Sequence, residues 1–318
     1  MPIGILAGLL TCALWGLTFV APLIVAPYTP WDLTIARYGI FGALSLLLLA
    51  FRPFRQGPWT LPRLVTALLL GGLCYVGYFV SAAFAVRFAG AAIPPLIIGL
   101  MPVTLAAIAN LQERKLPWRR LSVPLAMILT GLLIVNLSAL WTAPPAGRGE
   151  RWLGILCAAA SLLIWIVYGQ VNASALRRRQ SPSVLSWTCV QGIGAGLGSL
   201  TLLPVSSFVT AQHFAPDTSV RFWSWALIMG VAASWLAAYC WAEASRRLPL
   251  VLASQLIVAE TVFGLAYGFV YAMRWPTPME ASGALLQVVG VCLAIALLAK
   301  QERLANAGST PRNPLLAE

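Results

Sequence analysis

Residues 3–24 read IGILAGLLTCALWGLTFVAPLI and contain no charged side chain. A helix needs about 20 apolar residues to cross the hydrocarbon core of a bilayer, so this stretch predicts a membrane-spanning helix. The stretch has neither a basic amino-terminal region nor a small-residue cleavage site. We therefore interpret it as a retained helix rather than a removed signal peptide.

Apolar runs of the same kind fill the rest of the chain. The 318 residues are 60% hydrophobic and only 9% charged, with a mean hydropathy of +0.84, whereas soluble domains carry about 25% charged residues. A soluble globular fold is therefore excluded. The predicted fold class is an all-α polytopic membrane protein with ten transmembrane helices, at 3–24, 33–51, 63–86, 91–111, 119–139, 152–174, 183–204, 221–243, 250–272 and 280–299.

The basic residues predict the orientation. The formal net charge is +12, but Lys and Arg occur singly or in short clusters between apolar runs, which is typical of the positive-inside distribution and not of a nucleic-acid-binding patch. Fifteen of them fall on one set of alternate connectors and five on the other, namely Arg87, Arg148, Arg151, Arg221 and Arg274. We therefore expect both termini to be cytoplasmic, at the plasma membrane or the inner membrane of a Gram-negative bacterium. Residues 300–318 are expected to form a disordered cytoplasmic tail.

A faint internal repeat divides the chain. A shift of 150 residues places Trp15 on Trp165, and a shift of 159 superposes Gly71 on Gly230, Arg87 on Arg246, Val103 on Val262, Pro117 on Pro276 and Gly131 on Gly290. With five helices on each side, this predicts two related units, 3–139 and 152–299. Because five is odd, the second unit enters the membrane upside down, and inverted repeats are characteristic of transporters.

The sequence resembles the drug/metabolite transporter superfamily, and within it the EamA-type proteins with two five-helix units. The residues that carry the resemblance are Ala13-Leu14-Trp15-Gly16, Ala36-Arg37, Pro102-Val103, Glu113, Gly131 and Gly290. The second unit departs from the pattern, with Thr261 in place of the proline and Ala272 in place of Glu113. The resemblance implies export of a small metabolite, with amino acids or amphipathic amines as the substrate class.

Glu260 is an acid near the middle of the predicted helix 250–272. A charge at that depth costs about 3 kcal/mol on insertion scales. Burial favours the neutral form of a carboxyl, so Glu260 is the candidate for proton coupling. The alternative is a protonated or Arg-paired structural acid at a helix contact.

Aromatic and polar side chains at helical spacing form the predicted substrate site. Trp15 lies on one face of the first predicted helix, and Trp165 and Tyr168 lie on the matching face of the sixth. If these faces converge, they enclose an aromatic-lined cavity, as ligand sites usually are; the alternative is that the rings only pack between helices. The full set of substrate-binding candidates is Trp15, Tyr78, Trp165, Tyr168, Trp235, Tyr239 and Gln255.

Two further features of the helices are interpreted structurally. Pro102 removes a backbone donor inside the predicted helix 91–111, which makes it the candidate for a gating kink. Asp32 is expected to cap the second helix, while Arg37 snorkels or pairs with a carboxylate.

The chain also lacks several signatures. The six cysteines lie in apolar runs without metal-ligand spacing and are expected to be free, buried thiols. No Walker-type phosphate loop or HExxH motif is present, so neither catalysis, nor a metal, nor a cofactor, nor ATP-driven pumping is predicted. The expected partners are a small-molecule substrate and the lipid bilayer, in a monomer or homodimer. A secondary transporter with alternating access is the favoured function, and a gradient-independent facilitator or exchanger and a flippase of a lipid-linked substrate remain alternatives.

Overall fold

The computed structural model describes residues 2–89, 97–113, 117–142, 148–208 and 216–308. In this part of the chain, nine helical segments are long and apolar enough to cross a membrane: Pro2–Ile24, Pro30–Leu48, Leu61–Ala85, Trp118–Val135, Glu150–Arg177, Val184–Val205, Pro216–Arg247, Leu250–Tyr271 and Pro278–Gln301. They coincide with nine of the ten predicted helices. The prediction at 91–111 begins outside the described residues, and its described part includes α7 (Met101–Glu113).

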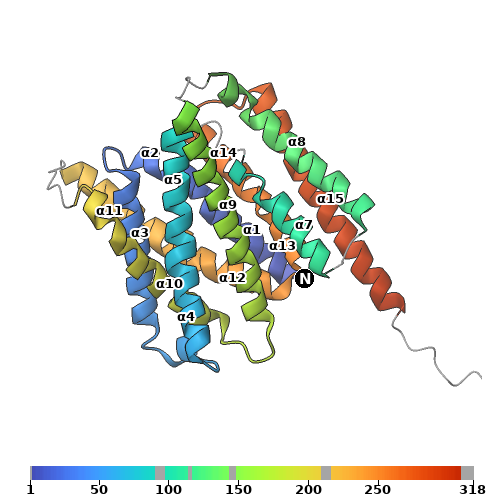
Figure 1. Ribbon diagram of the computed structural model, residues 1–318, viewed down its shortest axis with the longest axis horizontal. Helices are drawn as coiled ribbons and strands as arrows, with labels where there is room; N and C mark the ends of the chain where they lie inside the picture. The colour runs from blue at the N-terminus through green and yellow to red at the C-terminus, as the bar shows by residue number, and fades with distance from the viewer. Residues whose placement is uncertain (1, 90–96, 114–116, 143–147, 209–215, 309–318) are drawn as a thin grey trace, which may run out of the picture.

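Several of these spans are interrupted helices (Figure 1). In chain order the elements are α1 (Pro2–Gly16), η1 (Leu17–Phe19), α2 (Ala21–Ile24), α3 (Pro30–Leu48), η2 (Arg52–Arg55), α4 (Leu61–Leu69), η3 (Leu70–Val76), α5 (Gly77–Ala89), α7, α8 (Trp118–Thr142), α9 (Arg148–Arg177), α10 (Val184–Ser199), η4 (Leu200–Val205), α11 (Pro216–Gly230), η5 (Val231–Leu236), α12 (Ala237–Arg247), α13 (Leu250–Leu256), α14 (Val258–Tyr271) and α15 (Pro278–Gly308).

The predicted end of the last helix is wrong. α15 continues to Gly308 rather than ending at residue 299, so the first part of the segment predicted to be a disordered tail is helical. Lys and Gln are good helix formers, and a helix can leave the membrane without losing its internal hydrogen bonds. The rest of the predicted tail, 309–318, lies outside the described residues.

The arrangement of the helices fits two inverted repeats. η3 and η5 are both π-helical, and under the 159-residue shift they coincide to within a few residues. The helix contacts match in the same way. α1 packs on α12, and their counterparts in the other half, α9 and α5, also pack on each other. Corresponding helices of the two halves also pair with each other, as α3 does with α10 and α8 with α15, which lie side by side in Figure 1.

Glycines explain how closely α8 and α15 approach. A Cβ on Gly131 would lie 2.5 Å from the carbonyl oxygen of Gly283, and a Cβ on Gly290 would lie 3.0 Å from that of Pro124. Small residues let backbones approach closely inside a membrane, where packing rather than burial from water drives helix association. Gly131 and Gly290, which the repeat superposes, therefore have the same structural role on the two helices.

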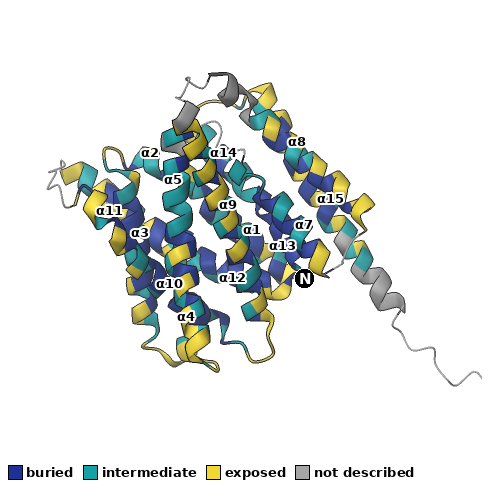
Figure 2. Cartoon of the chain, in the orientation of Figure 1, coloured by how far each residue is buried: buried dark blue, intermediate teal, exposed yellow. Residues whose placement is uncertain are grey.

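The outward surface is apolar, as expected for contact with lipid. Figure 2 shows exposed positions along the outer faces of the helices and buried positions along the inner faces. Leu6 and Leu156, at corresponding places in the two halves, are 66% and 64% exposed. The six cysteines are free, as predicted, but the prediction that all are buried is wrong, since Cys157 is half-buried and Cys292 is exposed. An apolar run contributes side chains to the lipid face as well as to the core.

Asp32 takes part in the cap of the second helix, but the N-cap residue is Thr29 and Asp32 is the third helical residue of α3, its partner in a capping box. The Asp32 carboxylate accepts hydrogen bonds from the Thr29 backbone N–H at 2.7 Å and the Thr29 hydroxyl at 2.8 Å, and the Asp32 N–H donates to Thr29 Oγ1 at 3.2 Å. The backbone N–H of Ser207 donates to the other carboxylate oxygen at 2.7 Å. The fully buried Asp32 thus ties the start of α3 to the segment after η4.

Candidate functional site

A cavity of about 500 Å³ lies between α5, α7, α8, α14 and α15; we call it the Glu260 cavity. Most of its lining is apolar, and the polar lining residues are Tyr78, Glu260, Thr261, Arg274, Glu280 and Gln287. A largely apolar pocket of this size with a few polar groups is typical of small-molecule sites.

Two helix breaks face this cavity. The chain is helical at 97–98, turns at Gly99 and Leu100, and resumes as α7, while α13 and α14 are separated at Ile257. The breaks correspond under the 159-residue shift, and residues on both of them line the cavity. Discontinuous helices of corresponding position are characteristic of transporter binding sites.

Pro102 lies at the first of these breaks, and the expectation that it sits inside a helix is wrong. It is the second residue of α7, where its missing N–H has no helical partner to lose. The interruption therefore comes from the turn at Gly99 and Leu100, and Pro102 begins the helix that follows. Its role as a gate stays a prediction.

Glu260 lies in the first turn of α14, where the positive end of the helix dipole favours an acidic group. Among the residues that the structure describes, none forms a hydrogen bond or ion pair with its carboxyl. The carbonyl that the break frees at Leu256 accepts a hydrogen bond from Cys12 Sγ at 3.1 Å. The backbone at the break is thus supported while the Glu260 side chain lines the cavity.

Arg37 is a second charge at membrane depth, and it does not pair with a carboxylate in the described structure. Its guanidinium donates to Ser234 Oγ at 2.7 Å, to the carbonyl of Ala233 at 2.9 Å and to Thr18 Oγ1 at 3.2 Å. These acceptors lie on η5 and η1, so Arg37 connects α3 to the irregular segments of two other spans. Its charge acts on Glu260 through space.

Four of the predicted substrate residues come together. Trp165 is in contact with Trp15, with ring centroids 5.2 Å apart, with Tyr78 at 5.3 Å and with Tyr168 at 4.8 Å. The two helix faces therefore converge, which was the condition for an aromatic-lined cavity, and the role of these residues in substrate binding stays a prediction. The rings pack against one another, however, and Tyr78 is the member of this group that lines the Glu260 cavity.

This aromatic cluster has two further members, of which sequence reasoning missed Trp241. Tyr75 hydrogen-bonds Tyr168 hydroxyl to hydroxyl at 2.8 Å, and the fully buried Trp241 lies 5.7 Å from Trp15. We define the aromatic cluster as Trp15, Tyr75, Tyr78, Trp165, Tyr168 and Trp241. A sequence signal for Trp241 exists, because it follows Ala237 and precedes Ala244 on one buried helical stripe.

The other predicted substrate residues lie elsewhere. Trp235 and Tyr239 stack on each other with centroids 5.9 Å apart, and Phe54 of η2 lies 6.1 Å from Trp235. Gln255 is fully buried on α13, and neither amide atom has a hydrogen-bond partner among the described residues. None of these three lines the Glu260 cavity, so a role for them in substrate binding stays a prediction.

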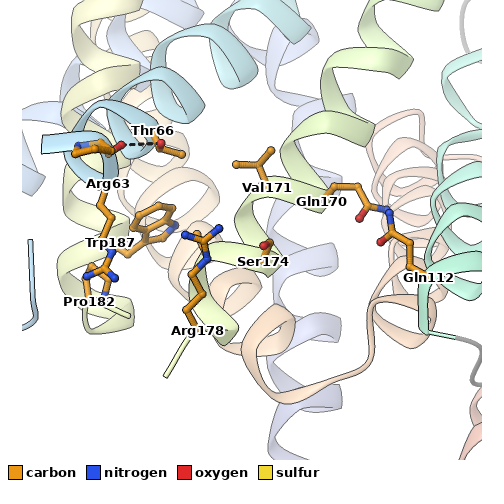
Figure 3. Close-up of a pocket in the computed structure, with 11 residues that line it drawn as sticks. Arg63, Thr66, Gln112, Gln170, Val171, Ser174, Arg178, Pro182 and Trp187 are labelled. Atoms are coloured by element: carbon orange, nitrogen blue, oxygen red, sulfur yellow. Dashed lines mark hydrogen bonds between the residues drawn. The ribbon is translucent and has the colours of Figure 1, made fainter. Parts of the chain in front are cut away.

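A second cavity, of about 460 Å³, lies between α4, α7, α9 and α10; we call it the Arg178 cavity (Figure 3). Arg63 and Arg178 line it, and the side chains of Gln112 and Gln170 extend toward each other in the close-up. Trp187 also lines it and donates from Nε1 to Asn172 Oδ1 at 2.8 Å.

The aromatic cluster lies next to the linings of both cavities. Along α9, Trp165 and Tyr168 precede Val171 and Ser174, which line the Arg178 cavity. Trp165 in turn packs on Tyr78, which lines the Glu260 cavity. A path of contacts from one lining to the other therefore runs through the packed rings.

No three His, Cys, Asp or Glu side chains of the described residues lie close enough together to hold a metal ion. Among the described residues, the candidate site is thus a pair of cavities, with the unpaired carboxyl of Glu260 in one of them and an aromatic cluster that adjoins both linings. That arrangement suits the binding and passage of a solute.

Comparison with known proteins agrees with this geometry. The profile of the EamA-like transporter family matches residues 2–137 and 152–296. The chain is 33% identical over 315 residues to the inner membrane protein YtfF of Escherichia coli (strain K12), covering 92% of this chain and 94% of that protein. A chain in a solved crystal structure has a TM-score of 0.73 and 21% identity, covering 92% of this chain and 98% of that chain, and at this identity the likeness shows the fold alone.

Proposed function

The chain belongs to the EamA-like transporter family, and we propose that it is a secondary transporter that alternates access to a central site between the two sides of the membrane. It is a membrane transporter and not an enzyme, as the family shows. The observation that supports the proposed mechanism is a pair of cavities whose linings are linked through the aromatic cluster. Exchange of the conformations of two inverted repeats opens one such cavity as it closes the other.

The substrate that we propose is a small metabolite, an amino acid or an amphipathic amine, and the direction is export. The size of the Glu260 cavity, its apolar walls and its carboxyl support a partly apolar solute that carries an amino group. The similarity to an inner membrane protein supports the same location for this chain. The excess of basic residues on one set of connectors supports cytoplasmic termini.

Proton coupling through Glu260 is the second part of the proposal. The Glu260 carboxyl has no ion partner among the described residues and lines the cavity, so proton binding and release there are tied to what else fills the cavity. The charged and titratable groups around it are Arg37 on α3, Tyr78 on α5, Cys12 on α1, and Arg274 with Glu280 at the cavity wall. Arg274 and Glu280 neutralise each other in an ion pair at 2.7 Å.

The test is proton flux in sealed proteoliposomes that contain a pH-sensitive dye and are challenged with amino acids and amines. Wild type should move protons with one class of compound, and Glu260→Gln should abolish the proton signal. Glu243→Gln is the matched control, since Glu243 is engaged by Arg246 and Arg247 at 2.9 and 2.6 Å and lies outside both cavities.

The same experiment separates the alternatives. Solute exchange without a proton signal in either wild type or Glu260→Gln would identify a facilitator or exchanger and leave Glu260 as a structural acid. Movement of a lipid-linked compound with no response to any soluble solute would identify a flippase.

A further inference from the structure

The charges that line the Glu260 cavity are unequally available to a ligand. Arg274 is occupied, because two of its nitrogens donate to the two carboxylate oxygens of Glu280 at 2.7 and 2.8 Å. Glu280 is held in turn by the backbone N–H of Thr277 at 2.8 Å, and the guanidinium lies 4.8 Å above the ring of Phe269. Such bidentate pairs are among the most geometrically specific in proteins.

Among the described residues, Glu260 is therefore the charged group of the lining that is available to bind a ligand. Its carboxyl has no ion partner among the described residues, and Arg274, the cation of the lining, is already paired. Arg37 acts on Glu260 but does not line the cavity, and its guanidinium is bound by three neutral acceptors. A ligand carboxylate would thus find no free cation, while a ligand cation would find a free carboxylate.

One more polar atom in the wall lacks a partner. Gln287 of α15 is 1% exposed and lines the cavity, and its Nε2 has no hydrogen-bond partner among the described residues. An amide nitrogen of this kind donates two hydrogen bonds. A buried donor without a partner has lost its hydrogen bonds to water, and a ligand with an acceptor atom can restore one of them.

We propose that the Glu260 cavity selects a monovalent organic cation, an amphipathic amine with a hydrogen-bond acceptor, and that the Arg274–Glu280 ion pair excludes carboxylates by keeping the guanidinium occupied. This rests on the proposed transport function and narrows its substrate class. Glu260 binds the ammonium group, Gln287 donates to the acceptor, and the apolar wall formed by Ile128, Leu132 and Leu265 contacts the hydrocarbon part.

The test compares three probes that share a phenyl ring on a two-carbon chain and differ in the charged groups attached to it: 2-phenylethylamine, phenylalanine and 3-phenylpropionate. They present a cation, a zwitterion and an anion, and their binding to the purified protein in lipid nanodiscs is measured by calorimetry. Wild type should bind the amine at least about tenfold more tightly than the other two, a difference of about 1.4 kcal/mol. Glu260→Gln should remove that preference.

Two variants test the ion pair. Glu280→Gln frees Arg274, so the affinity for phenylalanine and 3-phenylpropionate should rise by about tenfold, as a new charge-assisted contact predicts. The double variant Arg274→Gln/Glu280→Gln loses the same carboxylate but leaves no cation, and it should show no such gain. If the Glu280 variants fail to fold, the wild-type and Glu260→Gln measurements still decide the proposal.

The Gln287 contact is tested with a fourth probe. 2-Phenoxyethylamine adds an ether acceptor to the amine skeleton, and its advantage over 2-phenylethylamine should disappear in Gln287→Leu.

Equal affinity of wild type for the three original probes, or binding of none of them at millimolar concentration, would overturn the proposal. Transport of a zwitterion in preference to the amine would overturn it as well and leave the transport function intact. Amine binding without transport of any solute would instead refute the proposed function.

Discussion

Truncation of Trp165 tests whether the aromatic cluster is a barrier between the two cavities. Trp165 has four ring contacts in the cluster, with Tyr168, Trp15, Tyr78 and Tyr75 at centroid distances of 4.8, 5.2, 5.3 and 6.4 Å. Each aromatic pair contributes about 0.5–1.5 kcal/mol beyond the area that it buries. Trp165→Ala should therefore lose about 2–6 kcal/mol of ring–ring stabilisation, in addition to the cost of the cavity that it leaves.

Trp241→Ala is the matched control. Trp241 is fully buried and belongs to the same cluster, but among the described residues its ring pairs only with Trp15, at 5.7 Å. The same truncation leaves a similar cavity and should lose only about 0.5–1.5 kcal/mol of ring–ring stabilisation. Thermal unfolding in detergent, followed by circular dichroism, measures the difference between the two variants.

The barrier itself is measured as a leak. Proteoliposomes are loaded with radiolabelled sorbitol, and its efflux is followed without a driving gradient. Proteoliposomes with Trp165→Ala should leak sorbitol, because the row of rings between Tyr78 and Val171 is then incomplete. Proteoliposomes with Trp241→Ala or wild type should retain it. Equal leak rates in the two variants, or equal stability losses, would refute the assignment of Trp165 to the barrier.

Two other predictions concern the helix contacts that hold the cavities. Gly131→Ala should destabilise the protein by about 1–3 kcal/mol, as overpacking does, because the added Cβ would lie 2.5 Å from the carbonyl oxygen of Gly283. Gly39→Ala is the control: a Cβ at Gly39 has no neighbouring atom within 4 Å, so this variant should be neutral or slightly stabilised in the same thermal unfolding experiment. Asp32→Ala should cost about 2–4 kcal/mol through the lost capping box and the lost hydrogen bond from the Ser207 N–H, and denaturant titration that shows no loss would contradict the role given to this capping box.

Sequence reasoning found the elements of the candidate site but not their grouping. Trp15, Trp165 and Tyr168 could be placed on matching faces because helical spacing fixes which side chains share a face. Trp235 and Tyr239 have the same spacing and stack on each other instead. Spacing decides the face of a helix, but it does not decide what that face packs against.

The helix breaks show a similar limit. The sequence marks the first break with Pro102, yet the turn falls at Gly99 and Leu100. No proline marks the second break, at Ile257. Its stability comes from Cys12 of α1, whose thiol satisfies the freed carbonyl of Leu256, and such a contact between distant spans leaves no local signal.

The sequence by itself determined the membrane-spanning segments and the two-unit organisation, because bilayer thickness demands long apolar runs and a repeat leaves residues in register. It also singled out Glu260, because a charged carboxyl inside an apolar, membrane-spanning run is costly whatever the arrangement of the helices. Only the tertiary structure decided that Arg274 is occupied by Glu280, that Gln287 lines the same cavity as Glu260, and that packed rings adjoin the linings of two cavities. These relations join residues far apart in the chain, and distances across a helix bundle are set by packing, not by sequence spacing.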